Sequence, residues 1–152
     1  MKITDLKTFL VGATEGDYSD RPRGVNWLFV KIYTDEGITG VGEGGGWPAV
    51  VEKAIHELKH FLVGENPFDI ERLWHKLYFV IHGHGVTGAV RGGAISAIDT
   101  ALWDIKGKAL GVPVYELLGG KMRDAVPVYG HASTPEERSE EHTSELQSHL
   151  NL

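Results

Sequence analysis

Residues 94–119 read AISAIDTALWDIKGKALGVPVYELLG, and this stretch decides the fold of the 152-residue chain. At about 100° per residue, its apolar side chains fall within one arc of roughly 160°. The spacing predicts a helix from about residue 90 to residue 110, ended by Gly111, with one short helical turn over 113–118. Small residues within the arc let a neighbouring element approach closely. The arc consists of Ala94, Ala97, Ile98, Ala101, Leu102, Ile105 and Ala109.

Polar residues and a glycine in this helix have structural explanations. Gly107 costs about 1 kcal/mol in a helix interior relative to alanine, so we expect close backbone contact there. Asp104 and Lys108 are spaced i,i+4 in the favourable orientation for an ion pair. For Asp99 and Asp104, structural roles are favoured over active-site roles.

The residues before this helix predict a small sheet followed by helices. Residues 2–10 predict an edge strand, 25–34 a second strand rich in β-branched and aromatic residues, and 38–43 a third. The sequence Asp35-Glu36-Gly37 supplies the turn between the last two.

Two further helices are expected between the sheet and residue 90. One starts at Pro48 and stops at Gly64, and the next begins with the Asn66-Pro67 signal and reaches Ile81. Because the strands come before the helices, the pattern indicates an α+β domain rather than alternating βαβ units.

The order of small, apolar and acidic residues in 94–119 resembles the signature of the mandelate racemase/muconate lactonizing enzyme group of the enolase superfamily. The resemblance implies an N-terminal capping domain over residues 1–124: an antiparallel three-stranded meander followed by a helical bundle. It also implies that 125–133, which begins AVPVY, is the first strand of a C-terminal (β/α) barrel that is otherwise missing.

What the resemblance implies for function concerns the intact parent enzyme. Such a parent abstracts the proton α to a carboxylate, and Mg²⁺ stabilises the resulting enediolate. The cap looks most similar to those of acid-sugar dehydratases such as galactonate dehydratase. The family's metal ligands and its Lys or His bases lie on later barrel strands, so this chain is expected to contain no catalytic or metal-binding residue and to be inactive alone.

Several alternatives stay open. The cap could belong to a racemase or cycloisomerase of the same family, or the chain could be a stand-alone binding or dimerisation module. The expected partners are a small carboxylate (an acid sugar) and the missing barrel, in a homo-oligomeric parent.

Three loops rich in glycine are candidates for contact with that substrate. In the resembled family, the loop between the first two strands and the loop after the third shape specificity. Arginine can hold a carboxylate, and tryptophan can wall a pocket from water. The alternative is a set of surface loops without ligand contact. The candidate substrate-binding residues are Tyr18, Arg21, Arg23, Trp47, His82 and His84.

A zinc-protease motif occurs at residues 56–60, which read HELKH. In zinc hydrolases, both histidines of this motif bind the metal and the glutamate acts as base. Here the apolar stripe of the helix is centred near Val51 and Leu58, and His56 and His60 point roughly 160° away from it. We therefore expect an exposed polar face and no zinc site.

Composition excludes several classes of protein. The chain has no cysteine, which fits a reducing cytoplasm. No apolar run approaches the roughly 18 residues that span a bilayer. The formal net charge is −6, of which residues 134–152 carry −4, and the nearly neutral body offers no basic patch for nucleic acid. We expect a cytoplasmic protein.

The segment 134–152 differs in composition from the rest of the chain. From Arg138 onward it is polar and lacks helical or strand periodicity. It resembles the translation of a sequencing-library adapter, so we interpret 134–152 as non-native; a natural acidic tail is the alternative. A genomic read that continues past Glu137 into the same residues would contradict this interpretation.

Overall fold

A computed structural model describes residues 1–12, 26–81 and 88–126 of the chain. It divides into two units, Met1–Gly120 and Lys121–Leu152, each considered by itself. The first contains every helix and strand among these residues. None of the described helices is long and apolar enough to cross a membrane.

The sheet is an antiparallel meander in the order β1-β2-β3, comprising β1 (Ile3–Gly12), β2 (Asn26–Thr34) and β3 (Thr39–Gly44). The register pairs Phe9 with Phe29 and Phe29 with Glu43. The predicted meander, with its first strand at an edge, is confirmed. Alternation of side chains sends Leu28, Val30 and Ile32 of the central strand into the core.

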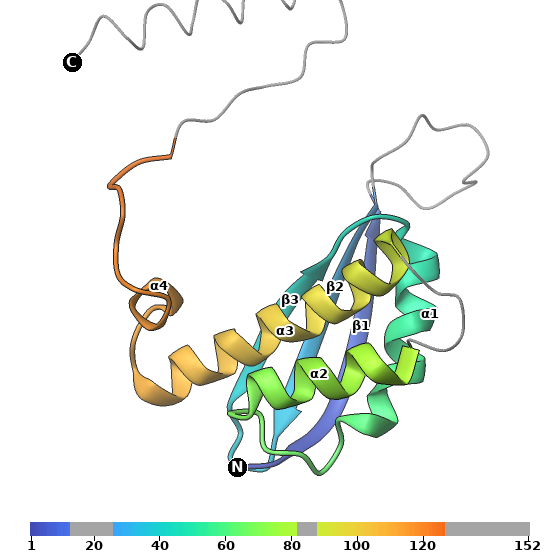
Figure 1. Ribbon diagram of the computed structural model, residues 1–152, viewed down its shortest axis with the longest axis horizontal. Helices are drawn as coiled ribbons and strands as arrows, with labels where there is room; N and C mark the ends of the chain where they lie inside the picture. The colour runs from blue at the N-terminus through green and yellow to red at the C-terminus, as the bar shows by residue number, and fades with distance from the viewer. Residues whose placement is uncertain (13–25, 82–87, 127–152) are drawn as a thin grey trace, which may run out of the picture. The chain divides into compact units, whose positions relative to one another are not determined.

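The described helices of this unit are α1 (Pro48–Leu58), the short 3-10 helix η2 (Lys59–Phe61), α2 (Ile70–Ile81), α3 (Ala89–Leu110) and α4 (Val114–Leu117). Helices α1 and α3 pack on one face of the sheet, and α2 and α4 pack on α3 (Figure 1). The described residues place no helix on the other face of the sheet. The core forms between sheet and helices, and its largest buried side chains are Ile3, Leu6, Leu28, Ile32, Ile55, Leu58, Leu62, Leu73, Leu77, Ile98, Leu102 and Ile105.

Helix α2 begins later than the Asn66-Pro67 signal predicts. The Asn66 side chain instead accepts a hydrogen bond from the Phe68 N–H at 3.2 Å, forming a turn. The Asp69 carbonyl then accepts from the Leu73 N–H at 2.9 Å, so the helix starts at Ile70.

The signature helix α3 packs directly on β3 through residues without bulk. A Cβ on Gly40 or Gly42 would lie closer than 3.0 Å to the carbonyl oxygen of Ala101 or Ala97 respectively, nearer than real Cβ atoms come. The predicted close approach of a neighbour to the alanines is therefore confirmed, and the neighbour is a strand backbone. Of the predicted arc, only Ala109 is not fully buried.

Gly107 also has the close contact that the sequence predicts. A Cβ there would lie 2.9 Å from the Val112 carbonyl oxygen and 3.3 Å from Cγ2 of Val114. Gly111, in the left-handed conformation with φ 69°, ends the helix and turns the chain back against it.

The predicted pair of Asp104 and Lys108 also joins α3 to the free edge of β3. Asp104 Oδ2 accepts from Lys108 Nζ at 2.6 Å and from the Val41 N–H at 2.8 Å, and Lys108 Nζ donates to the Thr39 carbonyl at 2.9 Å. The structural role expected for Asp104 is therefore present: it occupies a backbone donor that an edge strand would otherwise expose.

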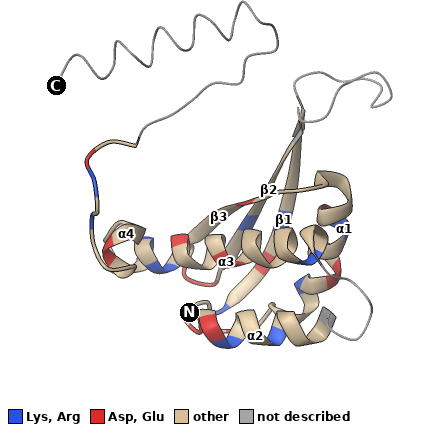
Figure 2. Ribbon diagram, turned by 45° about the horizontal axis from the view of Figure 1, so that its top comes forward, with Lys and Arg blue, Asp and Glu red and all other residues tan. Residues whose placement is uncertain are grey.

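Charges of both signs are interspersed along the helices (Figure 2). The largest ion cluster joins α2 to the turn before it: Glu65 contacts Arg72 at 2.6 Å and Lys76 at 2.5 Å. These hydrogen bonds, that from Lys76 above all, lower the pKa of the Glu65 carboxyl.

Residues 121–126 of the second unit form no helix or strand, and Lys121 pairs with Asp124 at 2.5 Å. Most of the predicted barrel strand (125–133) and the whole 134–152 segment lie outside the described residues. The proposed domain boundaries stay predictions.

Candidate functional site

Three connections of the first unit begin or end at one end of the sheet, where β1 stops, β2 starts and β3 stops (Figure 1). They are segment 13–25 between β1 and β2, the loop 45–47 between β3 and α1, and segment 82–87 before α3. Gly12 pairs with Asn26, and Leu28 pairs with Gly44, which places these strand ends side by side. The first turn of α3 lies at the same end, because a Cβ on Gly46 would lie 3.6 Å from Ala89 Cβ.

Trp47 is the predicted site residue that the described part of the chain places here. It is the residue before α1, and its carbonyl accepts the N–H groups of Val50 and Val51 at 3.0 and 2.8 Å. Its side chain is 74% exposed, more than any other tryptophan among the residues described. A large apolar ring held at such exposure is available to cover a ligand or a partner surface.

The other predicted site residues cannot be placed in the same way. Tyr18, Arg21 and Arg23 fall in segment 13–25, and His82 and His84 fall in 82–87, both outside the described residues. What the structure brings to one end of the sheet is the Trp47 loop, both ends of segment 13–25 and the start of α3, which follows segment 82–87.

Gly93 fixes the position of the Trp47 loop, a role that sequence reasoning missed. A Cβ at Gly93 would lie 2.5 Å from the Gly45 carbonyl oxygen and 3.3 Å from Cγ2 of Val51. The loop therefore rests on the backbone of α3. The only sequence signal was the Gly92-Gly93 pair in a helix, which does not say which glycine makes the contact.

The described residues do not form a metal centre. They contain no group of three or more His, Asp or Glu side chains that could hold a metal ion. We therefore assign no step of a metal-dependent reaction to residues of this chain.

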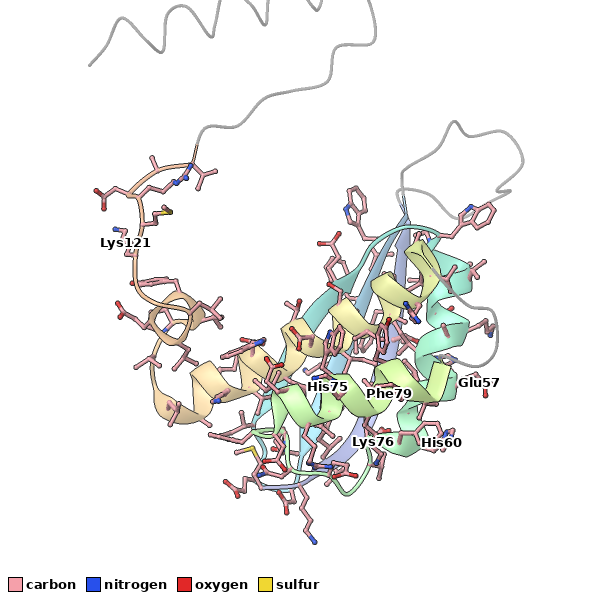
Figure 3. The ribbon with its side chains drawn as sticks, viewed as in Figure 1. Glu57, His60, His75, Lys76, Phe79 and Lys121 are labelled. Carbon is pink, nitrogen blue, oxygen red and sulfur yellow. The ribbon has the colours of Figure 1, made fainter. Side chains whose placement is uncertain are left out.

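The HELKH motif has other partners than a metal. His56 and His60 are exposed, and Figure 3 shows Glu57 and His60 at the outer side of the helix end. The Thr8 hydroxyl lies 2.8 Å from His56 Nε2 and donates to Glu52 Oε1 at 2.8 Å. Because that hydroxyl has one proton, His56 must donate through Nε2. The His60 ring lies against the Phe61 ring, with centroids 3.8 Å apart and planes tilted by 41°.

We expect zinc to leave the stability of the chain unchanged, because His56 and His60 lie on an exposed helix face and the described residues contain no group of three possible ligands. Thermal unfolding with and without equimolar ZnCl₂ should give the same midpoint, and His56→Ala should behave like the wild type in this comparison. A zinc-dependent rise that disappears in His56→Ala would contradict the assignment.

A sequence profile identifies the family. The profile described as "Mandelate racemase / muconate lactonizing enzyme, N-terminal domain" matches residues 23–119, which include β2, β3 and all the helices among the described residues. The chain belongs to this family. The matched residues include four of the predicted site residues, Arg23, Trp47, His82 and His84.

D-galactonate dehydratases are among the curated relatives of this chain. The chain is 51% identical over 131 residues to D-galactonate dehydratase of Xanthomonas axonopodis pv. citri (strain 306) and 50% identical to that of Variovorax paradoxus (strain S110). In each case the alignment covers 85% of this chain and 31% of the relative. The chain thus spans about a third of the length of the curated relatives it matches.

Solved structures of the family share the fold. The 3,6-anhydro-D-galactonate cycloisomerase from Zobellia galactanivorans is 34% identical with a TM-score of 0.79, over 97% of this chain and 40% of that one. An enolase from Pantoea ananatis, solved with bound D-gluconate and Mg, is 38% identical with a TM-score of 0.74, over 96% of this chain and 34% of that one. The expected cap architecture, a three-stranded meander with helices, is confirmed.

Asp99, the other acid of the family signature, lies on α3, within electrostatic range of Glu71 on α2. Burial raises the pKa of its carboxyl, the negative charge of Glu71 raises it further, and a hydrogen bond with Trp103 acts in the opposite direction. A group with these surroundings makes a folded protein less stable when it is charged.

Asp99→Asn is expected to raise the midpoint of thermal unfolding at pH 7 by roughly 2 °C, since the group is partly exposed and its penalty is small. A raised pKa in the folded state contributes stability that is present below the unfolded-state pKa, about 3.9, and is lost as the pH rises through the folded-state value. The advantage of the variant should therefore shrink towards zero as the pH falls below about 4. Calorimetry at both pH values tests this, and an equal difference at both would contradict it.

Proposed function

We propose that this chain is the substrate-capping domain of a Mg²⁺-dependent acid-sugar dehydratase that acts on an aldonate of the galactonate type. The observation that carries the proposal is the 50–51% identity to D-galactonate dehydratases across 85% of the chain. The parent is proposed to be cytoplasmic and homo-oligomeric. The chain alone is proposed to be inactive, since its described residues include no metal-binding group.

The proposed contribution of the cap is to close the site and orient the substrate. Tyr18, Arg21 and Arg23 would approach the sugar from the first connection, and Arg guanidinium groups would hold the carboxylate through two parallel N–H bonds. Trp47 would exclude water from one side of the substrate. His82 and His84 would donate hydrogen bonds to hydroxyls. The exposure of Trp47 and the convergence of the loop ends support this arrangement.

The intact parent, recovered with its downstream coding sequence, tests the reaction. With galactonate and Mg²⁺ it should release water and form a 2-keto-3-deoxy acid, which semicarbazide detects. The present chain should give only background. Keto acid formation by the chain alone would refute its proposed inactivity, and failure of the parent on every aldonate tested would refute the proposed substrate class.

The same assay tests the role of Trp47. Trp47→Ala in the parent should reduce kcat/KM about tenfold, a loss of ~1.4 kcal/mol of transition-state binding. Trp74→Ala on α2 is the matched control and should leave kcat/KM unchanged. Equal effects of the two variants would contradict a substrate contact at Trp47.

A cycloisomerase cap is the second candidate, favoured by the TM-score of 0.79 to the 3,6-anhydro-D-galactonate cycloisomerase. The lower identity to that protein, 34%, places it behind the dehydratase. Isomerisation of an anhydro sugar acid without release of water by the parent would reverse the order.

A further inference from the structure

The start of α3, residues 89–93, supports the Trp47 loop. On one side of the helix, a Cβ on Gly93 would lie 2.5 Å from the Gly45 carbonyl oxygen, so the loop rests directly on the helix backbone. The helix is weakly buried where it carries this contact. None of residues 89–93 is fully buried, and the first buried side chain of α3 is that of Ala94.

The sequence of this helix start favours fraying. Gly88 at the N-cap offers no side-chain acceptor to the first N–H groups. Gly92 and Gly93 each lower the helix population about two- to fivefold relative to alanine. The first turn contains no acid, and Arg91 places a cation at the positive end of the helix dipole. The start of α3 therefore needs support from outside the helix.

Arg91 makes a contact that provides such support. Its guanidinium carbon lies 4.2 Å from the centre of the Tyr78 ring, well within the range of a cation–π interaction. Both side chains are half-buried. Tyr78 belongs to α2, which is anchored in the core by Leu73 and Leu77. The contact thus ties the weakly buried start of α3 to a helix that the core holds in place.

The two contacts of the helix start lie on opposite sides of it. Positions two residues apart in a helix are separated by about 200°, so Arg91 and Gly93 face in nearly opposite directions. Ala89 shares the side of Gly93, and a Cβ on Gly46 would lie 3.6 Å from its Cβ. The start of α3 is therefore held between α2 on one side and the Trp47 loop on the other.

We propose that Arg91 is a positioning residue for Trp47: its contact with Tyr78 holds the start of α3, which in turn holds the Trp47 loop. A half-buried cation–π contact changes a local opening equilibrium about three- to tenfold, comparable with the cost of the two glycines. The structural part of this inference is independent of the reaction. Its consequence for substrate binding rests on the function proposed above.

Hydrogen exchange at two backbone amides tests the structural part on the 152-residue chain. The Gly92 N–H donates to the Gly88 carbonyl at 2.9 Å, and the Val50 N–H donates to the Trp47 carbonyl at 3.0 Å. The protection factor compares the observed exchange rate with that of the unstructured chain. Arg91→Gln should lower it about three- to tenfold at Gly92 and about twofold or more at Val50.

The sign of the change separates the Tyr78 contact from the charge. Glutamine removes a cation from the positive end of the helix dipole, so without the contact Arg91→Gln would raise the protection of the helix start. Arg91→Lys keeps the cation but not the planar guanidinium, and its protection should lie between those of the wild type and Arg91→Gln.

A double variant and two controls complete the exchange measurement. Tyr78→Leu should lower protection at Gly92 as Arg91→Gln does, and the double variant should be no lower than the single ones, because each removes the same contact. Lys53→Gln, on the exposed side of α1, should leave protection unchanged. Constant protection of the Leu102 amide in the core shows that each variant keeps its fold.

The intact parent tests the consequence for the substrate. Arg91→Gln should raise the KM for galactonate about three- to fivefold with little change in kcat, and it should have no further effect on KM in the Trp47→Ala background. Trp74→Ala is the matched control. Trp74 also stacks on Tyr78, with ring centroids 5.1 Å apart, but it belongs to the same helix and does not tie α3 to α2.

Each arm has an outcome that overturns the proposal. Unchanged or higher protection of Gly92 in Arg91→Gln would rule out a supporting contact. Lower protection of Gly92 with unchanged protection of Val50 would rule out the link to the Trp47 loop, as would a KM effect that persists in Trp47→Ala. A parent that is inactive on every aldonate would refute the proposed function alone, since the exchange measurements decide the positioning role without it.

Discussion

Replacing Gly42 by alanine is expected to lower the midpoint of thermal unfolding by roughly 10 °C or more, a loss of at least about 2 kcal/mol. The new methyl group would be forced against the Ala97 carbonyl oxygen and within 3.0 Å of the Ala101 backbone nitrogen. Both are helix backbone atoms, which cannot rotate away as a side chain can. Helix α3 would have to move off the sheet and give up part of its buried surface.

Gly45→Ala is the matched control for this experiment. It lies just beyond the same strand, its φ is not in the left-handed region, and a Cβ there meets nothing within 4 Å. Its free energy of unfolding should change by less than about 0.5 kcal/mol. Thermal unfolding followed by circular dichroism measures both, and a Gly42→Ala midpoint within 2 °C, roughly, of the wild type would show that α3 is not in contact with β3 as described.

Two adjacent glycines of α3 are expected to respond to alanine with opposite signs. Gly92→Ala should stabilise the chain by about 0.5–1 kcal/mol, because alanine favours helix and its Cβ meets nothing within 4 Å. Gly93→Ala should destabilise it by about 1–2 kcal/mol, because the same helical gain is outweighed by the contact with the Gly45 carbonyl.

Each of these variants is the control for the other, since helix propensity and sequence neighbourhood are nearly the same. The sign of the difference in midpoint decides the outcome. If both variants stabilise the chain, the Trp47 loop does not rest on α3. In the parent, Gly93→Ala should also raise the KM for substrate through the displaced loop, whereas Gly92→Ala should leave it unchanged.

Local periodicity was sufficient to predict the elements of the fold. The apolar arc of 94–109 and the alternation in 25–34 each report one element whose buried face follows from its own sequence. The predicted start of α2 was wrong, because the Asn66 side chain stabilises a turn that competes with the first turn of a helix. The helix begins three residues later, where the Asp69 carbonyl accepts the first helical hydrogen bond.

The contacts that join the elements were harder to predict. Nothing local distinguishes Gly40 and Gly42, which support a helix about 60 residues away, from glycines that only permit a turn. The same is true of Gly93 and the Trp47 loop. The candidate site depends on such long-range contacts, so the sequence could predict its loops but not the residue that positions them.

The absence of side chains on the inner face of β3 has a consequence for the order of folding. Gly40, Gly42 and Gly44 offer the collapsing chain no apolar surface of their own, and the strand acquires a covered face only when α3 arrives. Loop closure across some 60 residues is slow compared with formation of the adjacent hairpin. During synthesis, the third strand is therefore covered only after the ribosome has released the signature helix. Until then, the backbone of its inner face is exposed to other proteins and to the rest of the nascent chain.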